Sequence, residues 1–458
     1  MGAQTTTSAA ALAANAPAAG AAARPAMRYL HPGRETMPRG ALAALQLARL
    51  RTTLRNAWDH VPAQRARLGA AGFGPDDLRT LDDVRHLPFT LKSELREHYP
   101  FGLFARPVGA LARLHASSGT TGKPTVVGYT HEDLDNWADL VARSFAAAGV
   151  RAGDVMHNAY GYGLFTGGLG AHDGATRLGA AVVPMSGGAT ERQVALIMDF
   201  GARVLCATPS YALAIAEVAE AQGVDLRHSA LEIGMFGAEP WSAAIRAEIE
   251  SRLGLRAVDI YGLSEIMGPG VACECECRAG LHGWEDHFLF EVIDPDSGRQ
   301  LPEGEAGELV ITTLTKQALP MLRYRTRDIS RITTAPCDCG RTHLRILRIT
   351  GRNDDMLIIR GVNVYPSQIE AVLLGRPQVA PHYQLVVERS GSLDHLTIEV
   401  EAQPGVDSAD FTDLAREVPH HIKSMVGIST EVQVQAPGAI PRSQGKAVRV
   451  RDLRPKEA

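Results

Sequence analysis

Residues 115–125 (HASSGTTGKPT) combine hydroxyl side chains, glycines and one lysine in a short stretch. Backbone N–H groups in such a loop can form a concavity that binds anions, and glycine permits the backbone angles required. Because Pro124 follows the lysine, the run departs from the Walker A pattern. It predicts a phosphate-holding loop, with an ordinary solvated loop as the alternative. The candidate residues are Ser117, Ser118, Gly119, Thr120, Thr121, Gly122 and Lys123.

Further segments follow this loop in a fixed order: 259–265 (DIYGLSE), 324–328 (YRTRD), 351–361 (GRNDDMLIIRG) and 441–446 (PRSQGK). Together they resemble the adenylate-forming superfamily, which includes acyl- and aryl-CoA synthetases, peptide-synthetase adenylation domains and firefly luciferase. The chain is more narrowly similar to the phenylacetate–CoA ligase family. That closer resemblance rests on 158–165 (NAYGYGLF), 236–241 (FGAEPW), 284–288 (WEDHF) and 361–366 (GVNVYP). It extends from Arg28 to Arg454.

The resemblance implies that ATP activates a carboxylic acid as an acyl-adenylate. Glu265 would coordinate Mg²⁺, which binds hard oxygen ligands. Asp328 would accept both ribose hydroxyl groups, which suits a side chain that only accepts hydrogen bonds. Taken alone, Asp328 fits an ion pair with a nearby arginine, and Tyr261, expected to stack on adenine, fits the core. The implied nucleotide site includes Ser117–Lys123 together with Ala238, Glu239, Pro240, Asp259, Tyr261, Gly262, Ser264, Asp328 and Arg352.

Lys446 is the candidate catalytic lysine, since it matches the family's Pro-Arg-Ser-x-Gly-Lys pattern. The resemblance implies that it bridges the attacking carboxylate and the α-phosphate, and a flexible point charge suits a group carried by a mobile domain. A large domain at 27–353 would precede a small mobile domain at 354–458, hinged at Asp354. Rotation of the small domain would admit coenzyme A. A carrier-protein thiol or another small molecule remains open as the acyl acceptor.

The candidate acid pocket combines aromatic and small apolar residues, which suit a flat ring. On the resemblance, its residues are Tyr160, Phe165, Gly237, Ala238 and Ile260. The family typically has His-Tyr-Gly where this chain has His172-Asp173-Gly174. If Asp173 faces the pocket, its carboxylate needs a donor, which favours an amino- or hydroxybenzoate over phenylacetate. If Asp173 faces water, this preference does not arise.

Six cysteines are too few and too uneven for a disulfide framework. The runs at 273–282 (CECECRAGLH) and 337–343 (CDCGRTH) supply thiolates and imidazoles, which suit tetrahedral zinc. Some relatives in the family carry similar runs, and on that resemblance the ligands are Cys275, His282, Cys337 and Cys339. Cys273 or Cys277 remains open as a replacement, and free thiols remain the alternative to zinc. Four protein ligands would make the site structural.

Composition is ordinary for a globular protein, and the small-molecule partners are what the resemblance implies. The 458 residues suggest two domains, and 45% are hydrophobic. The formal net charge of −4 gives no sign of a nucleic-acid or membrane-surface partner. No apolar run approaches the ~18–20 residues that cross a bilayer. Residues 1–26 form an Ala-rich tract, expected to be a disordered leader because it lacks a signal-peptide core. We expect a cytoplasmic protein and, since relatives are often dimers, a homodimer.

The elements that must position these residues follow an α/β pattern. Residues 40–91 have helical apolar spacing. Buried strands at 180–184 and 203–207 alternate with helices at 191–200 and 211–222, which predicts parallel sheet covered by helices. Residues 291–295 and 307–312 predict antiparallel strands separated by a turn. Past Gly351, strands at 383–388 and 396–400 indicate a small α+β domain.

Overall fold

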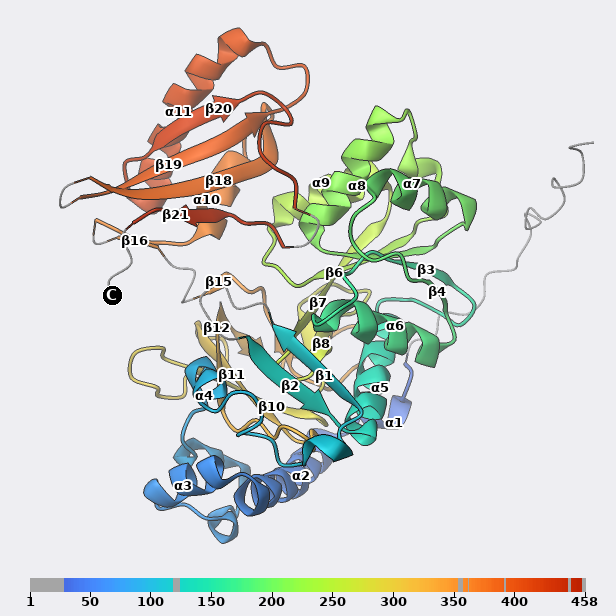
Figure 1. The fold of residues 1–458 in the computed structure, drawn as a ribbon, viewed down its shortest axis with the longest axis vertical. Coiled ribbons are helices and arrows are strands. Elements are labelled where there is room, and N and C mark those ends of the chain that lie inside the picture. The colour runs from blue at the N-terminus through green and yellow to red at the C-terminus, as the bar shows by residue number, and fades with distance from the viewer. Residues whose placement is uncertain are drawn as a thin grey trace, which may run out of the picture.

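The computed structural model of the chain describes residues 29–117, 124–352, 357–360, 362–390, 393–443 and 446–454. The chain forms a large N-terminal part and a small C-terminal part, orange to red in Figure 1, whose hydrophobic core contains only residues from Leu357 onward. The expected leader at 1–26 and the expected hinge at Asp354 lie outside the described residues.

A nine-stranded mixed sheet forms the centre of the large part, in the order β13-β14-β9-β8-β7-β6-β5-β3-β4. Strands β4, β3, β5, β6 and β7 are parallel, and the strands from β7 to β13 pair antiparallel. Their bounds are β3 (Val155–Asn158), β4 (Ala181–Val183), β5 (Val204–Ala207), β6 (Ile233–Gly237), β7 (Arg256–Leu263), β8 (Gly268–Glu274), β9 (Leu281–Gly283), β13 (Ile332–Thr333) and β14 (Arg345–Ile346).

Two groups of helices supply side chains to two separate hydrophobic clusters that include strands of this sheet. Helices α5 (His131–Ala147) and α6 (Thr166–Leu178) contribute to one cluster, and α7 (Thr190–Asp199), α8 (Pro209–Ala221) and α9 (Ala243–Leu253) to the other. Local sequence fixes where they begin. The Thr130 hydroxyl accepts the Asp133 N–H at 3.1 Å at the start of α5, and α8 begins with a proline.

A four-stranded antiparallel sheet, β10-β11-β12-β15, packs in the lower half of Figure 1. A hairpin of β1 and β2 lies near it in this view, and the N-terminal helices lie beneath. The bounds are α1 (Pro32–Glu35), α2 (Arg39–His60), α3 (Pro62–Ala70), α4 (Lys92–Glu97), β1 (Arg113–Ser117), β2 (Thr125–Tyr129), β10 (Phe288–Ile293), β11 (Gly307–Thr313), β12 (Tyr324–Ser330) and β15 (Gly351–Arg352).

The small part is an α+β unit. Its four-stranded sheet has the order β20-β19-β18-β21, and α10 and α11 pack against each other and against this sheet. The strand pair β16-β17 precedes them. The bounds are β16 (Leu357–Ile359), β17 (Val362–Val364), α10 (Pro366–Leu373), β18 (Val379–Ser390), β19 (Leu393–Ala402), α11 (Phe411–Val426), β20 (Glu431–Gln435) and β21 (Val450–Asp452).

The expected α/β class is confirmed, with two local corrections. Within 40–91, α-helix extends only to Ala70, as the two helices α2 and α3 separated by Val61. After Ala70 the chain forms the 3₁₀ turns Pro75–Asp77 and Leu81–His86, and then the short helix α4. Proline and paired aspartates favour such turns over a regular helix. Strand β4, expected to be buried, is half exposed because it is the last strand of its sheet. The other expected helices and strands match within a few residues.

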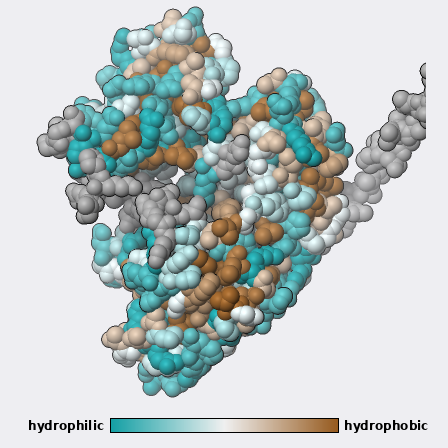
Figure 2. Space-filling view, in the orientation of Figure 1, coloured by the Kyte–Doolittle hydropathy of each residue, from teal (hydrophilic) through white to brown (hydrophobic). Residues whose placement is uncertain are grey.

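Among the residues that the structure describes, no helix combines the length and apolar character needed to cross a membrane. On the face shown in Figure 2, hydrophilic surface is interrupted by apolar patches, which gather over the lower half of the large part.

Candidate active site and metal cluster

The carboxyl ends of parallel strands β3, β5, β6 and β7 meet at one edge of the central sheet. Ligands of open α/β sheets bind outside such an edge. Tyr160 follows β3, and its hydroxyl donates to the carbonyl of Met235 on β6 at 3.1 Å. Ala238 and Glu239 follow β6, and Glu265 follows β7. The order of the strands thus brings together candidate residues from Tyr160 to Glu265, which are about a hundred residues apart in the sequence.

Two glycines allow close backbone approach at this edge. A Cβ at Gly237 would lie 2.1 Å from the Ile260 carbonyl oxygen, and one at Gly262 would lie 1.8 Å from that of Gly268. Only glycine fits either place. Ala238 adopts a left-handed backbone with φ of 72°. The segment after β6 is therefore held in a specific turn against β7.

The candidate ribose acceptor and the candidate adenine-stacking residue contact each other directly. The Tyr261 hydroxyl donates to Oδ2 of Asp328 at 2.6 Å, and Asp328 is buried on β12. Arg325 and Arg327, the alternative partners that the sequence suggested for Asp328, both pair with Glu308. Asp328 thus lies beside Tyr261, where both can reach one nucleoside.

Glu265, the candidate magnesium ligand, lies between two lysines. Its side chain is buried, and Oε1 lies 3.2 Å from Nζ of Lys92. Lys316 donates from Nζ to the backbone carbonyl of Glu265 at 3.3 Å. Lys316 also lies 4.6 Å from the centre of the Tyr129 ring, a cation–π contact. Burial lowers the pKa of Lys316 to about 8, against smaller opposing effects of Asp133 and Glu265.

We expect Lys316→Met to change the pH dependence of stability. Because the pKa of folded Lys316, about 8, lies below the ordinary value of 10.5, the unfolded chain binds more protons between these pH values. The stability of the wild type relative to the variant should therefore rise with pH across this interval, by at most about 3 kcal/mol. Urea unfolding of both proteins at about pH 7.5 and about pH 10 measures the change.

The matched control is Lys423→Met, because Lys423 is exposed on α11. Its stability should follow that of the wild type at both pH values. If the free energies of unfolding of the wild type and Lys316→Met differed by the same amount at both pH values, that result would contradict the lowered pKa of Lys316.

Lys446 lies next to the candidate acid pocket. Its Nζ is 5.8 Å from the centre of the Phe165 ring, and Phe165 precedes α6. The next residue, Ala447, donates its N–H to Oε2 of Glu239 at 2.7 Å, while Oε1 of Glu239 accepts the Ser210 N–H at 2.7 Å. The candidate lysine of the small part therefore sits at the same sheet edge as Tyr160 and Tyr261.

Asp173 already has a charged donor within the chain. Arg113, at the start of β1, donates from Nη1 to Oδ2 of Asp173 at 2.7 Å. Both side chains remain about a quarter exposed, 26% and 28% respectively. A substituted benzoate is expected only if Asp173 needs a donor from the substrate. The structure removes that requirement, so Asp173 gives no support to an amino- or hydroxybenzoate.

Asp259, another candidate nucleotide residue, lies on β7 before the glycine turn. Its backbone N–H donates to Glu274 on β8 at 2.9 Å. Burial, and then the nearby Glu274 charge, raise the pKa of Asp259 to about 7. Ser264 exchanges a hydroxyl hydrogen bond of 2.9 Å with Thr166 at the start of α6, which ties the end of β7 to this helix.

The phosphate-loop candidate lies outside the described residues from Ser118 to Lys123. Ser117 ends β1 and is opposite Thr125, which begins β2, so the run connects two antiparallel strands. Strand β2, rather than the helix that follows a Walker A lysine, begins directly after Pro124. In backbone register, Arg352 on β15 is opposite Asp328 on β12.

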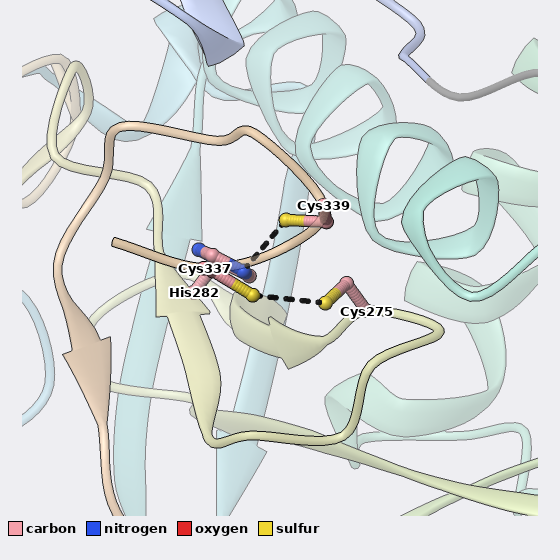
Figure 3. Close-up of side chains that lie close together, drawn as sticks. All are labelled: Cys275, His282, Cys337 and Cys339. Atoms are coloured by element: carbon pink, nitrogen blue, oxygen red, sulfur yellow. Dashed lines mark hydrogen bonds between the residues drawn. The ribbon is translucent and has the colours of Figure 1, made fainter. Parts of the chain in front are cut away.

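Four side chains converge in a buried metal-binding geometry (Figure 3). The ligand atoms of Cys275, His282, Cys337 and Cys339 all lie within 4.8 Å of one another. The Cys275 and Cys337 sulfurs are 3.8 Å apart, and Cys339 Sγ is 3.3 Å from His282 Nε2. Tetrahedral zinc with ~2.3 Å bonds to sulfur separates two sulfurs by about 3.8 Å. The donor set and its spacing fit zinc.

Neither open replacement ligand belongs to this cluster. Cys273 is buried and donates to the Ser144 carbonyl at 3.6 Å, and Cys277 is exposed. The adjacent Cys275 thiol and His282 imidazole lower the pKa of the Cys339 thiol, although burial opposes this. A metal-binding thiolate therefore forms readily at Cys339.

The cluster also anchors the start of the described chain. The Tyr29 hydroxyl donates to the Cys339 carbonyl at 2.7 Å. Arg341 forms a buried ion pair of 2.7 Å with Glu35, whose carboxylate also accepts the N–H of Leu30 at 2.8 Å. The turn after β8 and the loop between β13 and β14 thus meet the N-terminal segment here.

Lys92 and Lys316 contact Glu265 although no sequence motif contains them. Lys316 had a usable signal, because it is the single charged residue between Glu308 and Arg323. A lone lysine in so apolar a stretch is rarely buried without a partner. Lys92 lies in an ordinary charged helix and gave no such signal.

Family models match two parts of the chain: residues 107–315 match the AMP-binding enzyme model, and residues 361–454 match the AMP-binding enzyme C-terminal domain. The chain is 54% identical to phenylacetate-coenzyme A ligase of Aromatoleum evansii, covering 91% of this chain and 95% of that protein. It is also 54% identical to phenylacetate-coenzyme A ligase of Escherichia coli strain K12, covering 92% and 97% respectively.

Solved structures of 2-hydroxyisobutyryl-CoA ligase are similar throughout. In the postadenylation state with 2-HIB-AMP that enzyme has a TM-score of 0.88, 32% identity and coverage of 93% of this chain and 92% of that chain. In the thioesterification state with 2-HIB-AMP and CoA the TM-score is 0.70, with 33% identity and 93% coverage of both chains. The described arrangement is closer to the first state.

Proposed function

This chain belongs to the phenylacetate–coenzyme A ligase family of adenylate-forming enzymes, and we propose that phenylacetate is the acid it activates. As a member it is an AMP-forming acid–CoA ligase that works through an acyl-adenylate. The observation that carries the choice of acid is the identity of 54% to phenylacetate-coenzyme A ligase over nearly the whole chain. The Arg113–Asp173 pair supports it, because no polar ring substituent is needed to neutralise Asp173.

In the adenylation step, a carboxylate oxygen of the acid attacks the α-phosphorus, and the bond to the bridging oxygen breaks to release pyrophosphate. Asp328 accepts the ribose hydroxyls, and Tyr261 positions the nucleoside. Lys446 neutralises charge between the carboxylate and the α-phosphate. Such preorganised charge is worth most in a partly water-excluded site. Glu265 is the residue that would hold Mg²⁺, which supplies further neutralisation of phosphate charge.

In the second step, the thiol of coenzyme A releases its proton to solvent and its sulfur attacks the acyl carbonyl carbon, and AMP leaves with the electron pair of the broken bond. We expect Lys446 to leave the pocket before this step, because rotation of the small domain, which carries Lys446, admits coenzyme A. Its place on a separately cored C-terminal unit supports this role. The similarity to the postadenylation state supports assigning the described arrangement to the first step.

We expect phenylacetate to exceed 2-aminobenzoate and 4-hydroxybenzoate in kcat/KM. The physical reason is that a hydroxyl or amino group would be desolvated beside aromatic walls, while the Asp173 carboxylate is already paired with Arg113. The measurement is acid-dependent pyrophosphate release with and without coenzyme A, with products identified by mass spectrometry. A CoA-dependent phenylacetyl thioester is the expected product.

The matched variant is Asp173→Asn, which removes the charge opposite Arg113. Its order of preference among the acids should be unchanged. A benzoate that outperforms phenylacetate, with the advantage lost in Asp173→Asn, would overturn the proposed acid. Adenylate formation with no thioester would instead indicate a carrier protein or another small molecule as acceptor.

We also propose that Cys275, His282, Cys337 and Cys339 hold a structural zinc ion. Their separations and burial support this assignment. Four protein ligands leave no position for substrate, and the cluster belongs to strands and loops that pack the N-terminal segment. The metal would therefore stabilise the large domain rather than take part in the chemistry.

A further inference from the structure

A cluster of charged side chains joins the two parts of the molecule on the side of helix α8. Glu217 on this helix is the contribution of the large part. Its Oε1 accepts a hydrogen bond from His382 on β18, and its Oε2 accepts one from Nε of Arg442 at 2.9 Å. Both partners belong to the small part, so one carboxylate binds two of its residues.

Arg442 is itself held rigidly within the small part. Its two terminal nitrogens donate to both oxygens of Glu401, at 2.7 and 2.8 Å. Glu401 is buried on β19 and also accepts the backbone N–H of Ile440 at 2.6 Å and that of Gly438 at 3.0 Å. A bidentate arginine–carboxylate pair fixes orientation as well as position. Hydrogen bonds therefore connect Glu217, through Arg442 and Glu401, to the backbone of Ile440, six residues before Lys446.

A second carboxylate of the large part binds the other side of the same segment. Glu239 accepts the N–H of Ala447, directly after Lys446, and the N–H of Ser210, at the start of α8. Glu217 and Glu239 thus contact residues on both sides of the candidate catalytic lysine. Glu217 belongs to α8, and Glu239, which follows β6, is bonded to the first turn of the same helix, so α8 links the two contacts.

The charge state of Glu217 suits this role. Although burial opposes ionisation, the bonds from His382 and Arg442 outweigh it and lower the pKa of Glu217 to about 2. The carboxylate is therefore ionised at neutral pH. Removal of the Glu217 carboxylate would leave the His382 and Arg442 donors without this acceptor.

We propose that Glu217 is a positioning residue for adenylation: by binding His382 and Arg442 it docks the small domain so that Lys446 faces the α-phosphate. The inference rests on the proposed function for the identity of the step, but the docking contact does not depend on the acid. The contact belongs to the arrangement similar to the postadenylation state, so it should favour the first half-reaction alone.

The test compares Glu217→Ala with Glu220→Gln. Glu220 lies on the same helix and pairs with Arg252 within the large part, at 2.6 Å, so its loss leaves the contact between the parts intact. Acid-dependent pyrophosphate release should fall about 10- to 100-fold in Glu217→Ala, in the range of typical conformational coupling. Thioester formation from supplied phenylacetyl-adenylate and coenzyme A should change less than about threefold. Glu220→Gln should match the wild type in both.

Hydrogen exchange without substrates supplies a second readout. The peptide that contains Ile440 and Ala447 should exchange faster in Glu217→Ala than in the wild type or Glu220→Gln. His382→Ala should give a smaller effect, because it removes one of the two bonds of Glu217. Adding it to Glu217→Ala should change little, because that variant has already lost the bond to His382.

Unchanged exchange together with an unchanged ratio of the two half-reactions would overturn the proposal. Equal loss of both half-reactions with a lower melting temperature would also overturn it, by assigning Glu217 a general structural role. If the wild type activates no aromatic acid, the proposed function fails. The exchange difference then decides the docking contact on its own.

Discussion

Replacing Lys446 with alanine should lower the rate of adenylation by about 10²–10³-fold, the cost of removing one preorganised charge or donor from a transition state. The side chain lies against Phe165 at the sheet edge that holds Tyr261, and flanking residues are bonded to Glu217 and Glu239. Thioester formation from supplied phenylacetyl-adenylate should remain within a few-fold of the wild type, because the lysine acts in the first step. Pyrophosphate release and single-turnover thioester formation measure the two steps separately.

The matched control is Lys423→Ala, since Lys423 is an exposed lysine of the same domain. Its rates should equal those of the wild type in both steps. Comparable losses in the two steps for Lys446→Ala would contradict a role confined to adenylation, and undiminished adenylation would remove the lysine from the mechanism.

Loss of one metal ligand should have the second large effect, on stability. In Cys339→Ser, bound zinc should fall from about one ion per chain to near zero. The free energy of unfolding should fall by more than about 3 kcal/mol, a fraction of the ~10–16 kcal/mol that structural zinc supplies in zinc-finger peptides. Elemental analysis of protein purified without added zinc, with urea unfolding, measures both quantities.

Cys277→Ser serves as the control, because Cys277 is exposed and lies outside the cluster. It should retain both the metal and the stability of the wild type. Wild-type protein without stoichiometric metal would refute the zinc site, whatever the stability of the variant.

The bounds of helices and strands could be predicted from sequence where the apolar pattern of a short segment decides them. Strand β5 and helices α7 and α8 have the apolar periods expected of a buried strand and of amphipathic or buried helices, and their observed bounds agree closely. The resemblance to relatives with similar runs, and not spacing alone, selected the four cysteine and histidine residues that converge, since the runs themselves left Cys273 and Cys277 open as ligands.

Prediction failed where a partner distant in sequence decides the outcome. Asp173 suggested a polar substrate, but Arg113, sixty residues earlier, pairs with it. No sequence signal singled out Glu217, whose partners lie 165 and 225 residues later. Such pairs are set by the packing of whole domains, which apolar periodicity does not encode.

The attachment of the N-terminal segment to the cysteine cluster also constrains how the chain folds. Glu35 and Arg341 form a buried pair although 306 residues separate them. At a synthesis rate of about 5–20 residues per second, the ribosome reaches Arg341 roughly 15–60 s after Glu35. Until then Glu35 lacks its counter-charge, and the cluster lacks two of its thiols. The large domain therefore cannot complete its structure from the N-terminus onward as it emerges, and its final closure is a late, long-range event of the kind that slows folding.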